Sequence, residues 1–307
     1  MRRLVGVLTT AAFSVALMMG QLVPARADAA DTAGGRDRWE PCVGKQQTVT
    51  VTADASGLHF STTRISEGWV NFRASTTNDG SEVTLFRPRR GVSPAQVVGE
   101  VMSGLNSDDN EVRAASARAM KQHARFYGLT QVQPGAPATA TVMLKAGSYF
   151  AAEFMYGRPA PTPTQLAVVS DHRHGRQPRH RHCAPRSDAT IALQQENHIS
   201  IRGDLPASGA VLVRNRSDAV QIAVLSPITA GTTETQVQAY FDGGAEGPWP
   251  FPRPGPSVGT DFLSPGKELV LTYDVTPGTY ILASYMPDLH TGLPTAFLGM
   301  YRVVELG

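Results

Sequence analysis

The feature that most constrains this chain is a set of short alternating segments that occurs twice. Stretches such as 48–52 and 139–144 alternate apolar and polar side chains, as half-buried strands do, and glycine and proline separate them. The expected strands are 48–52, 70–73, 83–86 and 139–144 in the first half, and 198–201, 211–213, 222–225 and 269–273 in the second. We infer that one β-rich unit is used twice.

A turn followed by a strand gives the clearest internal match. Residues 145–151 read KAGSYFA and residues 276–282 read TPGTYIL, so each places glycine at the turn and tyrosine at the start of an apolar strand. A chain of 307 residues suits about two domains. Many short strands with regular turns favour two β-sandwiches over one mixed sheet.

Each half also carries an insertion. In the first, Ser93 is a helix cap, Pro94 suits the first turn, and apolar residues follow at helical spacing to Leu105. A second helical stretch is expected over 112–126. In the second half, a shorter helix is expected over 232–241, before a Pro/Gly-rich loop.

The two ends and the middle set the expected domain boundaries. Residues 1–27 have the basic start, apolar stretch and Ala-Arg-Ala ending of a signal peptide, so we expect a secreted protein without a transmembrane anchor in its mature form. We expect a flexible leader over 28–41, domains over 42–170 and 188–307, and a His/Arg-rich linker over 171–187.

Net charge gives no support for a nucleic-acid partner. The full chain has 28 basic and 26 acidic residues. Residues 1–27 contain three arginines and no acidic residue, which leaves 25 basic against 26 acidic residues after cleavage. A global attraction to nucleic acid therefore disappears with the signal peptide.

The second half carries a recognisable set of positions. Asn215 follows an expected strand, the Gly-Thr-Tyr turn follows at 278–280, Met-Pro-Asp occupies 286–288, and Leu-Gly-Met occupies 298–300. This half resembles the bacterial cupredoxin-like family of plastocyanin/azurin type, and the first half is a weaker match. The resemblance implies an all-β fold of two tandem Greek-key β-sandwiches, each with a helical or loop insertion.

Copper members of that family bind the metal with two histidines, one cysteine and a weak axial methionine. The resemblance places these ligands at Gln221, Ser284, Thr295 and Met300, so only the methionine matches. A serine hydroxyl stays protonated near neutral pH and cannot replace a thiolate. We therefore expect degenerate copper positions and no blue-copper electron transfer.

The linker holds the strongest cluster of metal-ligand side chains. His172 and His174 form one pair and His180 and His182 another, and in an extended segment each pair points to one side. Each pair would suit Cu²⁺ or Zn²⁺. The alternative is a solvated linker, because short His-rich tracts are a compositional signal.

The two cysteines, Cys42 and Cys183, fall in the part expected to be exported. An oxidising compartment favours one disulfide between them. Two free thiols, or a Cys183 that helps the neighbouring histidines to bind metal, are the alternatives.

No catalytic residue is nominated. Glu153 and His290 would matter only in a deep pocket beside a second titratable group. In the Pro-rich loop, Trp249 and Phe251 form a recognition surface or cover the open end of the second sandwich. We expect a non-catalytic protein that binds an extracellular protein, a polymer or a small ligand; the alternative is copper or zinc binding through the linker.

Overall fold

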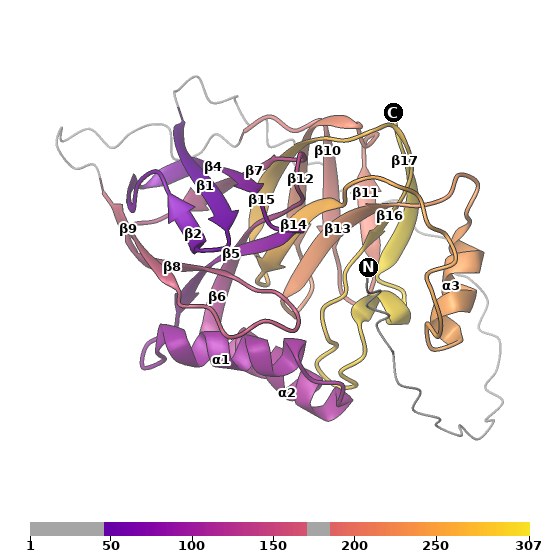
Figure 1. Ribbon diagram of the computed structural model, residues 1–307, viewed down its shortest axis with the longest axis horizontal. Coiled ribbons are helices and arrows are strands. Elements are labelled where there is room, and N and C mark those ends of the chain that lie inside the picture. The colour runs from indigo at the N-terminus through magenta and orange to yellow at the C-terminus, as the bar shows by residue number, and fades with distance from the viewer. Residues whose placement is uncertain (1–45, 171–184) are drawn as a thin grey trace, which may run out of the picture.

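The computed structural model describes residues 46–170 and 185–307. Its strands form two mixed sheets, which confirms the expected all-β class of two sandwiches with helical insertions (Figure 1). The first unit contains β1 Gln47–Asp54, β2 Gly57–Phe60, β3 Arg64–Ser66, β4 Gly68–Thr76, β5 Ser81–Pro88, α1 Pro94–Leu105, α2 Asn110–His123, β6 Ala124–Val132, β7 Ala138–Leu144, β8 Gly147–Glu153 and β9 Thr164–Val169. The second contains β10 Ala189–Leu193, β11 Ile199–Arg202, β12 Ser208–Asn215, β13 Gln221–Pro227, α3 Glu234–Asp242, β14 Val258–Leu263, β15 Glu268–Asp274, β16 Gly278–Ala283, the 3₁₀ helix η2 Thr295–Leu298 and β17 Tyr301–Leu306.

The duplication inferred from the sequence is visible in the strand pairing. β1 pairs antiparallel with β2 and parallel with β4, and β10 pairs in the same way with β11 and β12. The set β4–β7, β5–β6, β5–β8 and β8–β9 recurs as β12–β15, β13–β14, β13–β16 and β16–β17. The helices of both units follow equivalent strands, β5 and β13.

The two glycine–tyrosine turns make equivalent contacts in the two units. The Tyr149 hydroxyl donates to the carbonyl of Lys145 at 2.9 Å, and the Tyr280 hydroxyl donates to the carbonyl of Thr276 at 2.7 Å. The guanidinium groups of Arg87 and Arg253 lie over these two rings. Each turn glycine has a positive φ, which L side chains rarely adopt, so the backbone of both turns requires glycine.

The two units are joined edge to edge. β7 pairs antiparallel with β15 in an eight-stranded sheet, and β6 pairs antiparallel with β14 in a nine-stranded sheet. We call the line where β6 meets β14 the seam. Both sheets therefore run through both units, and one core cluster contains Leu129 of β6 together with Leu263 of β14 and Leu269 of β15.

The helical insertions confirm two sequence predictions and correct the end of a third. Helix α1 begins at Pro94, and the hydroxyl of Ser93 accepts from the backbone N–H of Gln96. Helix α3 begins after Thr233, within the expected stretch. Helix α2 ends at His123, so residues 124–126, which were expected to be helical, belong to β6. The described helices include none long and apolar enough to cross a membrane.

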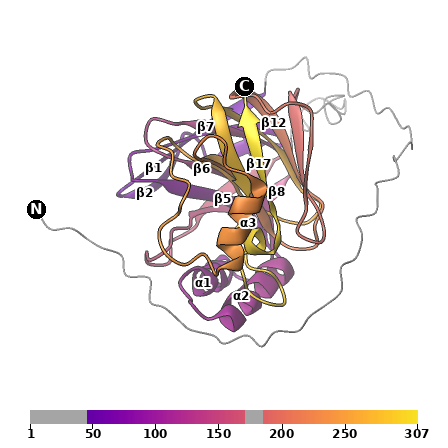
Figure 2. The same ribbon diagram turned by 90° about the vertical axis from the view of Figure 1, so that its right-hand side faces the viewer.

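The helices of the two units pack differently. Helices α1 and α2 lie below the sheets in Figure 1, and their apolar side chains pack with Val224 of β13, Phe262 of β14 and Met286 of the second unit. Helix α3 instead lies beside β17 of its own unit (Figure 2), and its Phe241 shares an apolar cluster with Ile281 of β16 and Tyr301 of β17. The first unit's helices thus lie across the seam.

Candidate functional site

The structure brings together the four positions at which the family resemblance places copper ligands. Gln221, Ser284, Thr295 and Met300 all lie within the second unit, and each is at most 2% exposed. The Ser284 hydroxyl donates to Gln221 Oε1 at 2.5 Å, and the Thr295 hydroxyl lies 3.3 Å from the same oxygen. The Thr295 hydroxyl also lies 2.8 Å from the Ser284 carbonyl.

This cluster does not fit a type 1 copper ion. Its side-chain atoms are an amide, two hydroxyls and a thioether, without the thiolate and imidazoles that such an ion requires. The hydroxyl of Ser284 also accepts the backbone N–H of Ile222 at 3.3 Å. The polar groups of Gln221, Ser284 and Thr295 therefore hydrogen-bond to one another, and the cluster is part of the core.

A pocket of about 520 Å³ lies at the seam, and it is the best candidate for a functional site. Helices α1 and α2 and strands β5 and β6 of the first unit form one part of its wall, while β13, β14 and residues 285–294 of the second form the rest. Its apolar lining includes Val101, Leu105, Met120, Ile222, Val224, Phe262 and Met286. A volume in this range suits a small organic molecule.

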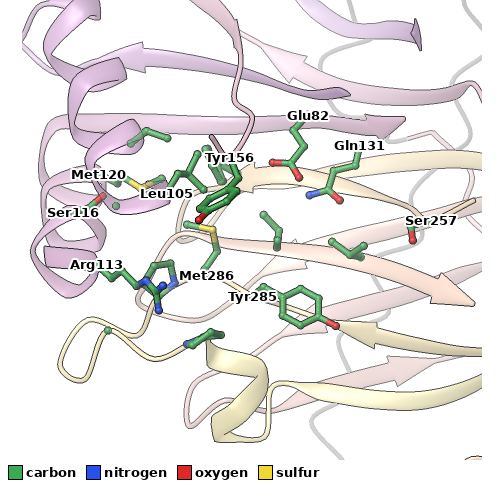
Figure 3. A pocket seen from close by; sticks show the side chains of 18 of the residues that line it. Glu82, Leu105, Arg113, Ser116, Met120, Gln131, Tyr156, Ser257, Tyr285 and Met286 are labelled. Atoms are coloured by element: carbon green, nitrogen blue, oxygen red, sulfur yellow. The ribbon is translucent and has the colours of Figure 1, made fainter. Parts of the chain in front are cut away.

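One side of the pocket is polar and acidic. Glu82 of β5 lies beside Gln131, its partner across the antiparallel pair with β6, and Figure 3 shows both on the side opposite Arg113. Burial raises the pKa of Glu82 to about 7, because a carboxylate loses hydration when it is withdrawn from water. Glu82 therefore changes its charge near neutral pH.

Asp261 of β14 is a second carboxyl group near Glu82, but it does not belong to the pocket lining. It is fully buried, and burial raises its pKa well above the usual range, with a further rise from the negative charge of Glu82. The Phe262 backbone N–H and the Thr84 hydroxyl lie near enough to lower that pKa, but no donor meets hydrogen-bond geometry with either carboxyl oxygen. At the seam, Glu82 of the first unit and Asp261 of the second therefore lie close enough for the charge of one to affect the pKa of the other.

The rest of the polar lining is largely occupied. The Arg113 guanidinium donates to the Ser107 carbonyl at 2.7 Å, and it lies 3.4 Å from a carboxylate oxygen of Asp108. The Ser257 hydroxyl lies 2.9 Å from that of Ser226. Of the acidic and basic side chains described in the lining, Glu82 and Arg113, it is Arg113 that has an ion-pair partner, in Asp108.

Two tyrosines stand at the mouth of the pocket, one from each unit. Tyr156 is 72% exposed and Tyr285 is 39% exposed, although both contribute to the lining. Figure 3 labels both tyrosines among the side chains that line the pocket. Large aromatic side chains exposed at a pocket mouth are typical of ligand-binding sites.

The Pro-rich loop packs against its own unit. Trp249 and Phe251 are both half-buried and join the cluster formed by α3, β16 and β17. The Trp249 ring lies edge-on to Tyr240, and its indole N–H donates to the Phe251 carbonyl at 3.1 Å. Both interpretations of this loop, a recognition surface and a cover for the sandwich end, stay predictions.

The remaining sequence candidates lie away from the pocket or outside the described residues. Glu153 is half-buried and accepts from the Asn78 amide at 3.4 Å, and His290 is exposed in a loop. The expected metal ligands and disulfide lie outside the described residues: His172, His174, His180 and His182, with Cys42 and Cys183. Within 46–170 and 185–307, no three His, Cys, Asp or Glu side chains are grouped as a metal site.

The acidic side of the pocket was not predicted from the sequence. Glu82 looks like an ordinary polar residue of an alternating strand, and nothing near it in sequence indicates that helices will cover it. Asp261 did carry a signal, because it interrupts the run Val258–Leu263, in which every residue is buried. A carboxylate in such a strand needs a partner or a special role.

The sequence matches no protein-family model, and no curated protein sequence is similar to it. Among solved structures, it is similar to an auracyanin from Roseiflexus castenholzii, with 23% identity over 38% of this chain and 94% of that one, at a TM-score of 0.24. It is also similar to auracyanin A from Chloroflexus aurantiacus, a blue copper protein, with 14% identity over 41% of this chain and 100% of that one, at a TM-score of 0.29. A third similar structure is a copper nitrite reductase from Nitrosomonas europaea, with 10% identity over 86% of this chain and 94% of that one, at a TM-score of 0.23. Likenesses this weak carry no argument about the chemistry of this chain.

Proposed function

We propose that this protein is a secreted, non-catalytic binding protein that holds a small organic ligand in the seam pocket between two copper-free cupredoxin-like units. The observation that carries the proposal is the pocket of about 520 Å³, whose walls come from both units. The signal-peptide pattern of residues 1–27 supports secretion. The hydrogen-bonded cluster around Ser284 supports a role without a type 1 copper ion.

The pocket is suited to binding more than to catalysis. Its lining is mainly apolar, and it brings no nucleophile together with a base in hydrogen-bond contact among the described residues. An apolar cavity with few polar groups fixes a ligand by shape and by one oriented contact.

A pocket-filling variant tests the proposal. Val224 lines the pocket, so Val224→Phe should occupy part of it, whereas Val112→Phe adds the same ring on the exposed side of α2. We expect the full secreted chain to bind one molecule of the neutral dye Nile red, with affinity reduced at least about tenfold in Val224→Phe and unchanged in Val112→Phe. Fluorescence titration measures both. Equal affinities in the two variants would place the dye elsewhere.

Copper or zinc binding through the linker is the second candidate, because His172, His174, His180 and His182 form two closely spaced pairs. Metal analysis of untagged protein separates it from the first candidate. Stoichiometric metal that is lost when all four histidines are changed to alanine would favour it. An absence of bound metal after incubation with excess ion would count against it.

A further inference from the structure

We propose that the seam pocket selects organic ammonium ions, with the cationic group against Glu82 and an apolar body along the helices. This inference rests on the proposed function and specifies its ligand class. It is carried by the arrangement of three features: the acidic side, the apolar wall and the aromatic mouth.

The acidic side presents acceptors without a matching cation. Glu82 lines this side of the pocket, and the buried Asp261 lies near it, on the other side of β6 and outside the lining. Neither carboxyl oxygen of Asp261 has a hydrogen bond of good geometry. Among the described residues that line the pocket, the basic side chain is Arg113, which lies opposite Glu82 and is engaged by the Ser107 carbonyl. A positively charged ligand supplies the charge that this side lacks.

The wall and the mouth fit the remainder of such a ligand. Between Glu82 and Arg113 the pocket is lined by apolar side chains such as Leu105 and Phe262, which favour an aliphatic or aromatic body. The exposed rings of Tyr156 and Tyr285 attract cations through their faces at the entrance. An anionic molecule would meet the carboxyl group of Glu82 at the polar side, which disfavours its binding.

Ammonium binding should depend on pH because it favours the ionised carboxylate. The groups that face Glu82 are Asp261 from β14, Arg113 from α2 and the two tyrosines at the mouth. Burial raises the pKa of Glu82 to about 7 and that of Asp261 well above its usual range, so the charge of Glu82 changes between pH 6 and 8.5. The acidic pair is therefore the group that titrates, and affinity for an ammonium ion should rise with pH across this range.

Three compounds of one shape test the inference: 4-phenylbutylamine, 4-phenyl-1-butanol and 4-phenylbutyrate, titrated calorimetrically into the full chain. At pH 8 we expect the amine to bind at least about tenfold more tightly than the alcohol. The carboxylate should bind more weakly than both. At pH 6 the preference for the amine should shrink severalfold, whereas alcohol binding should stay constant.

Two variants and a metal control test whether the preference for the amine over the alcohol depends on Glu82. In Glu82→Gln the amine should lose its advantage while the alcohol binds as before, which also shows that the variant is folded. In Glu153→Gln, which removes a carboxylate on the neighbouring strand β8, the advantage should remain. Displacement of the amine by micromolar Ca²⁺ or Zn²⁺ would identify a metal site and overturn the inference.

The outcomes separate this inference from the proposed function. Binding of the alcohol and of Nile red in the pocket, without preference for the amine, would overturn the ligand class and leave the binding function standing. Binding of none of these compounds would overturn both.

Discussion

Gln221 and Asp261 are both buried polar side chains of the nine-stranded sheet, but they differ in their hydrogen-bond partners. Gln221 Oε1 accepts from the Ser284 hydroxyl, and Thr295 completes the same cluster. Asp261 lacks such donors and lies near a second acid, Glu82. A satisfied cluster stabilises a core, whereas an unsatisfied buried carboxyl group costs stability.

The cost of Asp261 should appear in the pH dependence of stability. A carboxyl group whose pKa is raised in the folded protein stabilises it most below the pKa of the unfolded chain, and this stability is lost as the pH rises through the folded value. For Glu82 that window runs from 4.5 to about 7, and for Asp261 it begins at 3.8 and extends upward. Each pKa unit corresponds to about 1.4 kcal/mol.

Asp261→Asn removes one titrating group and its repulsion of Glu82. We expect a smaller fall in Tm between pH 5 and 8.5 than in the unmodified protein, and a gain of about 1–3 kcal/mol at pH 8.5. Asp274→Asn, at the exposed end of β15, should leave the profile unchanged. Thermal unfolding followed by circular dichroism measures this. Parallel profiles for Asp261→Asn and the unmodified chain would show that Asp261 carries no such cost.

At the scale of elements, the sequence predicts contacts between residues that are close in the chain, but it does not predict which distant strands pair. The cap at Ser93 and the glycine–tyrosine turns were predictable because the interacting groups lie within four residues of one another. The pairing of β6 with β14 joins residues far apart in sequence, and no local pattern specifies that partner. The acidic side of the pocket depends on this pairing, so it could not be predicted either.

The loop between β16 and η2 fixes the position of one pocket wall against α2. Gly292 has φ +69°, and a Cβ there would collide with the carbonyl oxygen of Asn110 at the start of α2. Nearby, Arg118 of α2 donates to the Leu289 carbonyl at 2.5 Å. The close contact of these two elements therefore requires glycine.

Gly292→Ala should push this loop away from α2. Gly231, with φ +79° and open space where a Cβ would lie, gives a matched control for backbone strain alone. We expect Gly231→Ala to cost about 1–2 kcal/mol. Gly292→Ala should cost about 1–3 kcal/mol more and weaken Nile red binding. Urea unfolding and dye titration of both variants measure these effects; equal costs would mean that the loop yields without strain.

At the scale of the whole molecule, the sheets are nearly symmetric and the helices are not. Each unit contributes equivalent strands to both joints, β6 and β7 from the first and β14 and β15 from the second. Helices α1 and α2 lie across the seam, whereas α3 stays on its own unit. The pocket exists because of this difference, and it belongs to neither unit alone.

Anomalous diffraction from crystals soaked with 4-(4-bromophenyl)butylamine tests the central claim most directly, because it shows where the ligand lies. The account predicts one bromine peak per chain within the apolar part of the seam pocket, with the amine toward Glu82, and loss of that peak in Val224→Phe. Bromine found only outside this pocket, for example against the loop that carries Trp249 and Phe251, would contradict it.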